Sequence, residues 1–365
     1  MIITILIVLF SLILLTGLHE LGHFLFAKRF GIKVEEFGIC YPPRIYGKKI
    51  KGTIYSLNLL PFGAFVKIKG EDGAPASAEA SAGKGRENDS FACKPIWQRA
   101  VVLVAGVVMF WLVAFLIFTF VSGIFGVPTS ITDEMDSTNA TVQVMAVSDG
   151  SPAALAGIKS GDEFVKIEEA IINKTIQVQE IAQENLGKEI TLTLKRNNKE
   201  IEVALTPRAN PPQGEGAMGI ALVRVENMKT VWYKAPWQGI VLTARLTKAI
   251  PVNLYQAIKL KITGQKVVGV QFMGPIGFGQ MLGQSLESGL GNFMVLMGMI
   301  SIWLAIFNLF PIPALDGGRL LFLGIEAIRR KPINQKIEQK ITAFFFFGLI
   351  LMMIVLSVRD LFRIF

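Results

Sequence analysis

Four apolar stretches, each long enough to cross a bilayer as an α-helix, constrain the fold of this chain more than any other feature. A helix rises about 1.5 Å per residue, so about 20 apolar residues span a hydrocarbon core of about 30 Å. The spans are expected over residues 1–30, 97–126, 289–318 and 340–362. Hydrophobic residues make up 52% of the 365 residues and charged residues still reach 18%, which predicts several spanning helices together with a polar domain.

The first span contains the only two histidines of the chain, His19 and His23. In a helix, residues four apart lie on one face, and Glu20 stands beside that face. Two imidazoles at this spacing can bind one tetrahedral zinc ion, with room for a third ligand and a water. A neighbouring carboxylate can accept a proton from that water, as in the His-Glu-x-x-His motif of metallohydrolases. The alternative is a helix face on which these side chains bond each other. Ionisable groups at membrane depth are costly without a partner or a function, which favours the metal site.

Basic residues beside the spans predict the topology. Lys28, Arg29 and Lys33 follow the first span closely, so this loop is expected to be cytoplasmic and the N-terminus to lie outside. The net charge of +9 is explained by such loops, and no nucleic-acid partner is expected. The first span has no basic n-region and no small-residue cleavage site, so we expect it to be retained rather than removed as a signal peptide. Cys40 and Cys93 both fall on the expected cytoplasmic side, and no disulfide is expected.

Residues 31–69 have the pattern of a β-hairpin. Thr53–Leu59 alternates in part, Pro61-Phe62-Gly63 marks a turn, and Ala64–Lys69 alternates again. Such a hairpin can enter the membrane only if its backbone groups are covered by protein or face a wet cavity. A hairpin on the cytoplasmic surface fits the pattern equally well. Residues 70–96 then form a linker, because most of this segment is Ala-, Ser-, Gly- and Glu-rich with no apolar period.

The polar domain is expected over residues 138–208 as an α+β unit. Short strands are predicted near residues 142–147, 164–167, 190–194 and 201–205, with a short helix opening at Ser151. Residues 235–288 form an amphipathic segment that places basic residues among apolar ones. Such helices usually lie in the membrane interface, and a deeper buried role is the alternative.

The third span ends in a sequence that breaks a helix. Pro311 and Pro313 interrupt it, and Asp316 follows just past the break. Basic residues come next, so this end is also expected to face the cytoplasm, at the same leaflet as His19 and His23. A carboxylate oxygen is an acceptable zinc ligand, and Asp316 is therefore the predicted third ligand. The alternative is that Asp316 only caps the following helix.

These motifs resemble those of the site-2 protease family of intramembrane zinc metalloproteases, in the bacterial branch of peptidase family M50 that carries one PDZ domain. The resemblance covers nearly the whole chain. The matching segments are His19-Glu20-Leu21-Gly22-His23, Pro61 to Lys67, Lys94 to Arg99, Ser151 to Ile158 with Gly161-Asp162, Gly274 to Gly277, and Asn308 to Gly318.

The resemblance implies that the chain cleaves transmembrane helices of other proteins, commonly membrane-tethered regulators or leftover signal peptides. It also implies that Asp316 is the aspartate ligand and that Asn308 faces the substrate. Three positions depart from the family pattern: Cys40 stands where glycine is usual, Val107 where proline is frequent, and Phe110 where asparagine is usual. None of them is expected to touch the metal set, and we expect them to affect contacts of the second span with the substrate or the hairpin.

The expected fold is a polytopic α-helical membrane protein with about four transmembrane helices, a membrane-associated β-hairpin and one inserted α+β PDZ domain. The expected function is that of an intramembrane zinc endopeptidase, with Zn²⁺ on His19, His23 and Asp316 and with Glu20 as general base. The expected substrate-binding residues are Phe65, Val66, Asn308, Pro311 and Pro313. Expected partners are transmembrane protein substrates and the lipid bilayer; the oligomeric state is not predicted. The active site is expected toward the cytoplasmic leaflet of the plasma membrane, and the PDZ domain outside. A catalytically inactive scaffold carrying the PDZ domain is the first alternative, and a transporter ranks last because no internal repeat is visible.

Overall fold

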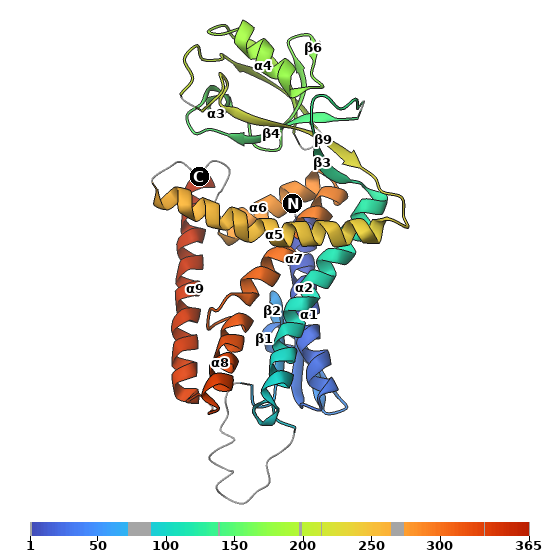
Figure 1. Ribbon diagram of the computed structural model, residues 1–365, viewed down its shortest axis with the longest axis vertical. Helices are drawn as coiled ribbons and strands as arrows, with labels where there is room; N and C mark the ends of the chain where they lie inside the picture. The colour runs from blue at the N-terminus through green and yellow to red at the C-terminus, as the bar shows by residue number, and fades with distance from the viewer. Residues whose placement is uncertain are drawn as a thin grey trace, which may run out of the picture.

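The computed structural model describes residues 2–71, 89–137, 139–196, 199–212, 214–263, 274–331 and 333–364. The chain forms a helical bundle with a β-sheet domain at one end (Figure 1). Most of the expected linker, residues 72–88, lies outside the described residues. At its end, Phe91–Cys93 forms a short 3-10 helix, η2.

Four helices of the described chain are long and apolar enough to cross a membrane, as the sequence predicts. They are α1 (Ile2–Arg29), α2 (Ile96–Ile124), α7 (Leu290–Leu309) and α9 (Gln335–Ile364). The most apolar window of α2 is half buried inside the protein, whereas none of the corresponding window of α9 is buried. Helix α2 is therefore the centre of the bundle and α9 its periphery (Figure 1).

Small residues allow the central helices to approach closely. A Cβ at Gly22 of α1 would lie 2.6 Å from the carbonyl oxygen of Ala105 on α2. A Cβ at Gly298 of α7 would lie 2.8 Å from the ring of Phe118 on α2. Both glycines are thus required by the packing of α1 and α7 against α2.

Two further helices occupy the amphipathic segment. Helix α5 (Ala235–Ile262) runs across the spans at the end nearest the β-sheet domain (Figure 1). It buries Ala235, Ile250 and Ala257 against the bundle and leaves Trp237 and Tyr255 exposed. Helix α6 (Pro275–Glu287) follows, and the N–H of Gly277 in its first turn donates to Asp360 of α9 at 2.8 Å. Asp360 thereby attaches the end of α9 to the bundle.

The hairpin consists of two long, bent strands, β1 (Val34–Ile50) and β2 (Thr53–Ile68). The first part of β1 pairs on one side with the end of β2 and on the other side with its beginning. For example, Phe37 lies opposite both Val66 and Tyr55. The hairpin packs along α1 within the height of the bundle (Figure 1). The strand segment 64–68 is an edge of this sheet, because on its far side it meets α1 instead of another strand.

The β-sheet domain is larger than the expected range of 138–208. Its sheet follows the order β3-β9-β4-β5-β7-β8, with β6 beside β5. The strands are β3 (Val127–Ile131), β4 (Thr141–Val147), β5 (Glu163–Ile167), β6 (Ala170–Ile171), β7 (Ile190–Arg196), β8 (Lys199–Leu205) and β9 (Ile220–Met228). Helices α3 (Pro152–Leu155) and α4 (Thr175–Glu184) cover it. The range was too short because β3 and β9 pair with each other from opposite ends of the domain, and local sequence patterns do not report such pairing.

Candidate active site

His19, His23 and Asp316 converge inside the bundle. The Nε2 atoms of the two histidines lie 3.2 Å apart, and each lies 3.4 Å from Oδ2 of Asp316. Both histidines are buried, at 8% and 6% exposure. The structure therefore brings together the three residues predicted as ligands, although 293 residues separate His23 from Asp316 in the chain.

This arrangement fits a zinc ion. Bonds of about 2.0–2.1 Å in a tetrahedral site place neighbouring ligand atoms about 3.3 Å apart, which matches the three separations given above. His23 Nδ1 lies 2.9 Å from the carbonyl oxygen of Val102. A carbonyl only accepts, so Nδ1 carries the proton and Nε2 presents its lone pair to the site. Oδ2 of Asp316 is buried and has no hydrogen-bond partner among the described residues. Such a group is costly unless a cation satisfies it.

Glycine at position 106 leaves the space that the histidines occupy. A Cβ there would lie 2.3 Å from His23 Nε2 and 2.8 Å from His19 Cε1. At position 106, α2 thus presents backbone rather than a side chain to the histidines. This role of Gly106 could not be predicted from the sequence, because no local pattern indicates which glycine of one span faces a side chain of another.

Asp316 reaches the site because the chain folds back sharply after α7. Pro311 and Pro313 interrupt the helix, and Asp316 is the first residue of α8 (Asp316–Arg329). A Cβ at Gly317 would lie 2.2 Å from the carbonyl oxygen of Phe310, and one at Gly318 would lie 2.2 Å from that of Ile312. Asp316 therefore opens a helix, as in the alternative interpretation, and its carboxylate still points at both histidines.

Glu20 connects the site to the hairpin. The backbone N–H of Val66 donates to Oε2 of Glu20 at 3.1 Å. Successive N–H groups of a strand point to opposite sides. The N–H of Lys69 donates to Lys33 on the β1 side, so the N–H groups of Lys67 and Phe65 point toward β1 as well. The edge that faces Glu20 consequently presents the N–H groups of alternate residues, including Val66.

The two histidines differ in what holds their rings. His23 is fixed by the carbonyl of Val102, whereas His19 Nδ1 is buried without a hydrogen-bond partner among the described residues. Instead, the ring of Phe110 stacks on His19, with centroids 4.4 Å apart and planes 14° apart. The expectation that none of the three departures touches the metal set is therefore wrong for Phe110, whose ring lies directly against His19.

The remaining predicted residues lie near the ends of the elements that form the site. Asn308 stands in the last turn of α7, where its Nδ2 donates to the carbonyl of Leu304 at 3.0 Å. Pro311 is exposed and Pro313 is buried, both in the loop before Asp316. Phe65 is half-buried and packs on Tyr41, with ring centroids 5.8 Å apart. Their role in substrate binding stays a prediction.

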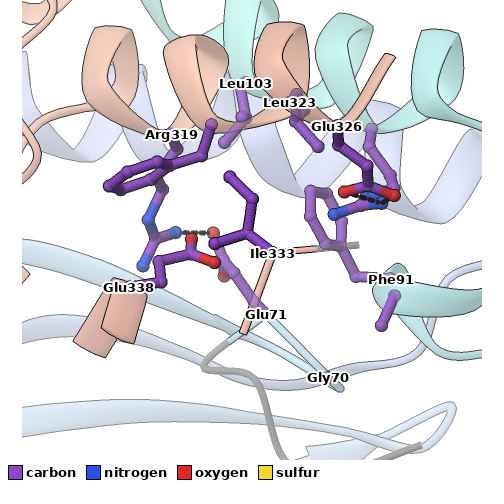
Figure 2. Close-up of a pocket in the computed structure, with 12 residues that line it drawn as sticks. Gly70, Glu71, Phe91, Leu103, Arg319, Leu323, Glu326, Ile333 and Glu338 are labelled. Carbon is purple, nitrogen blue, oxygen red and sulfur yellow. Dashed lines mark hydrogen bonds and ion pairs between the residues drawn. The ribbon is translucent and has the colours of Figure 1, made fainter. Parts of the chain in front are cut away.

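A small charged cavity of about 110 Å³ lies near the C-terminal end of β2 and the start of α8. Arg319, one turn after Asp316, pairs with Glu71, three residues after β2 ends (Figure 2). Arg99 of α2 pairs with Glu326 of α8 at 2.9 Å, and Glu338 of α9 points into the same cavity (Figure 2). These ion pairs tie the hairpin and α2 to the helix that carries Asp316.

Three convergent metal-ligand atoms beside a carboxylate, within a bundle of four candidate spans, define a membrane metalloenzyme. The family model described as Peptidase family M50 matches residues 7–354. The chain therefore belongs to peptidase family M50, and it is a zinc metalloendopeptidase.

Two relatives agree with this assignment. A putative zinc metalloprotease of Clostridium perfringens is 32% identical, over 97% of this chain and 98% of its own length. The regulator of sigma-W protease RasP of Bacillus subtilis is 30% identical, over 95% of both chains. Among solved structures, a PDZ domain of an SdrC-like protein from Listeria monocytogenes matches 24% of this chain and 93% of its own, at 22% identity and a TM-score of 0.22.

Proposed function

We propose that this protein is an intramembrane endopeptidase that hydrolyses peptide bonds within or near transmembrane segments of other proteins. The observation that carries the proposal is the convergence of His19, His23 and Asp316 beside Glu20 on helices that are long and apolar enough to span a membrane. A site built there is reached from the bilayer, so its natural substrates are membrane proteins.

Zinc held by these three residues would acidify a water molecule and polarise the scissile carbonyl. Glu20 is placed to accept the proton of the attacking water and to pass it to the leaving amine. The N–H of Val66 orients its carboxylate through a hydrogen bond of 3.1 Å. The stacked ring of Phe110 and the backbone at Gly106 lie against the histidines and exclude solvent from that side of the site.

A transmembrane helix must be unwound before it can be cut, because its carbonyls are held in internal hydrogen bonds. Freed N–H and C=O groups in the membrane cost several kcal/mol each unless something else satisfies them. We infer that the edge strand 64–68 receives the unwound substrate by strand addition. Its position against α1 and beside Glu20 supports this inference.

The hairpin is proposed to lie at membrane depth. It packs along α1 and exposes large apolar side chains, including Ile45, Leu59 and Phe62, the last at 73% exposure. Exposed apolar surface of this kind indicates contact with lipid or with an apolar partner. We place the site toward the cytoplasmic leaflet and the β-sheet domain outside, on the distribution of basic residues in the loops.

We propose that the β-sheet domain is the expected PDZ domain and that it mainly restricts access by bulky substrate ectodomains. Strand β3 pairs with residues 224–228 of β9. It begins two residues after the end of α2. On that side, residues 220–223 of β9 have no partner strand among the described ones, and α4 lies against β9. The uncovered part of β9 beside α4 is short, and the domain begins two residues after α2, which favours a steric filter over recognition of a long peptide.

The decisive experiment compares Glu20→Gln with the unaltered protein, purified and placed in lipid nanodiscs with a model transmembrane substrate. The variant should keep one zinc per chain while losing most turnover, because only the base is removed. A zinc chelator should stop the unaltered protein. Near-normal cleavage by Glu20→Gln would refute the assigned base, and a chain that binds zinc but never cleaves would favour the scaffold alternative.

Strand addition has its own test. Val66→Pro removes the N–H that faces Glu20 and should reduce cleavage sharply, whereas Phe65→Leu keeps the backbone N–H of the neighbouring residue and should be mild. If Val66→Pro folds, binds zinc and cleaves normally, substrate does not add to this edge. Deletion of residues 139–207 should let untrimmed substrates be cut; an equal loss for all substrates would instead indicate a recruiting role.

A further inference from the structure

The two histidines of the site are held by different physical means. The carbonyl of Val102 fixes the ring of His23 at 2.9 Å through Nδ1. Metal-bound imidazoles nearly always have such a partner on their second nitrogen, which sets the tautomer and the orientation of the ring. For His19, no described residue supplies one.

The ring of Phe110 restrains the imidazole of His19. Its ring is nearly parallel to the imidazole, at 14° and 4.4 Å between centroids. Phe110 is itself only 2% exposed and belongs to the same buried cluster as Val107, Phe293 and Met297. A further anchor comes from the hydroxyl of Ser301 on α7, which donates to the Phe110 carbonyl at 2.7 Å. The aromatic ring is therefore a rigid wall, fixed by α2 and α7 together.

The rigid phenyl ring restricts the motion of the stacked imidazole in one direction. Stacking prevents the imidazole from tilting out of its plane, because tilting would drive its edge into the phenyl ring or open a gap in a close-packed core. The helix of His19 limits rotation about its side-chain bonds. Together these restraints leave Nε2 pointing at Asp316 Oδ2, 3.4 Å away.

We propose that Phe110 is a positioning residue for the metal site, and that its stacked ring fixes the orientation of His19 in place of the missing hydrogen bond at Nδ1. The inference rests on the proposed role of His19 as a zinc ligand. It assigns a role in the metal site to one of the positions at which the chain departs from its family pattern.

The test measures zinc affinity on the purified full chain, by competition with a chromophoric chelator, rather than activity alone. Phe110→Leu keeps an apolar side chain but removes the ring, and should weaken zinc binding about tenfold, at the lower end of the effect of removing a partner of a metal-bound histidine. Phe110→Tyr keeps the stacked ring and should retain the affinity of the unaltered protein. In cobalt-substituted protein, Phe110→Leu should also change the visible absorption bands, which report ligand geometry.

Phe118→Leu is the matched control. Phe118 lies on the same helix, is 1% exposed and packs against α7 at Gly298 rather than against a histidine. It should lower thermal stability about as much as Phe110→Leu while leaving zinc affinity and the cobalt spectrum unchanged. Equal zinc affinity in Phe110→Leu and in the unaltered protein would overturn the inference, as would an equal loss in both leucine variants.

His19→Ala separates this inference from the proposed metal site. If His19→Ala leaves zinc affinity unchanged, the proposed ligand set fails. If His19→Ala weakens binding strongly but Phe110→Leu does not, the ligand set stands and only the role of Phe110 is refuted.

Discussion

Gly106 offers a direct test of the geometry of the metal site, because α2 meets both histidines at this residue. A Cβ at position 106 would lie 2.3 Å from His23 Nε2, 2.4 Å from His23 Cε1 and 2.8 Å from His19 Cε1. Ordinary van der Waals contact begins at 3.4 Å. In Gly106→Ala the ring of His23 must therefore move by about 1 Å, and a displacement of that size at a catalytic centre can cost about 100-fold in rate.

The helices cannot easily separate to relieve this clash. Gly22 already lets α1 approach the Ala105 carbonyl to a distance that a Cβ would not tolerate, and α2 is packed on its other side by α7 and α5. We expect Gly106→Ala to lower kcat/KM by at least about 100-fold and to weaken zinc binding. In an unconstrained helix, the same substitution would stabilise the protein by about 1 kcal/mol, because alanine is the better helix former.

The assay is cleavage of a transmembrane substrate in nanodiscs, with zinc content measured on the same samples. Gly123→Ala is the matched control on the same helix, since its Cβ would meet Ala235 at an ordinary 3.5 Å; it should leave both readouts unchanged. A Gly106→Ala protein with full zinc content and an unaltered cleavage rate would show that the histidines are not positioned as described here.

Three further outcomes are expected. Arg319→Glu should reduce cleavage, and adding Glu71→Arg should restore part of it, with a coupling energy of about 1 kcal/mol in the double-mutant cycle; additive effects would show that this ion pair does not hold the hairpin to α8. Asp360→Ala should loosen the end of α9 from α6, seen as faster hydrogen exchange at Gly277, while zinc affinity stays constant. Partial burial raises the pKa of Asp133, but hydrogen bonds from Thr175 and from the N–H of Ile176 outweigh it and hold that pKa below its ordinary value. These hydrogen bonds cap the start of α4, and their stabilisation is complete above about pH 4 and lost on further acidification. Asp133→Ala should therefore speed hydrogen exchange in α4 at pH 7. Unchanged exchange in α4 would show that Asp133 does not cap this helix.

The sequence alone was sufficient for features that depend on a single element. The thickness of the bilayer sets the length of a span, so four spans could be predicted from apolar length. Helix geometry places His19 and His23 on one face without knowledge of any other residue. Asp316 was predicted as the third ligand on a weaker basis, namely that its loop and the histidines lie at the same leaflet. In the structure, Oδ2 of Asp316 lies 3.4 Å from Nε2 of each histidine.

Only the tertiary structure decided which residues surround His19, His23 and Asp316. Val102 lies 79 residues from the histidine it orients, and no periodicity connects residues of different spans. The rotation of α2 places Gly106 and Phe110, one turn apart, against the histidines. The same limit applies to β3 and β9, whose pairing joins the two ends of the β-sheet domain. In the hairpin, alternation predicted a strand, but whether Phe65 or Val66 turns its N–H toward Glu20 depends on the register with β1. A shift of one residue would reverse that choice without changing the sequence pattern.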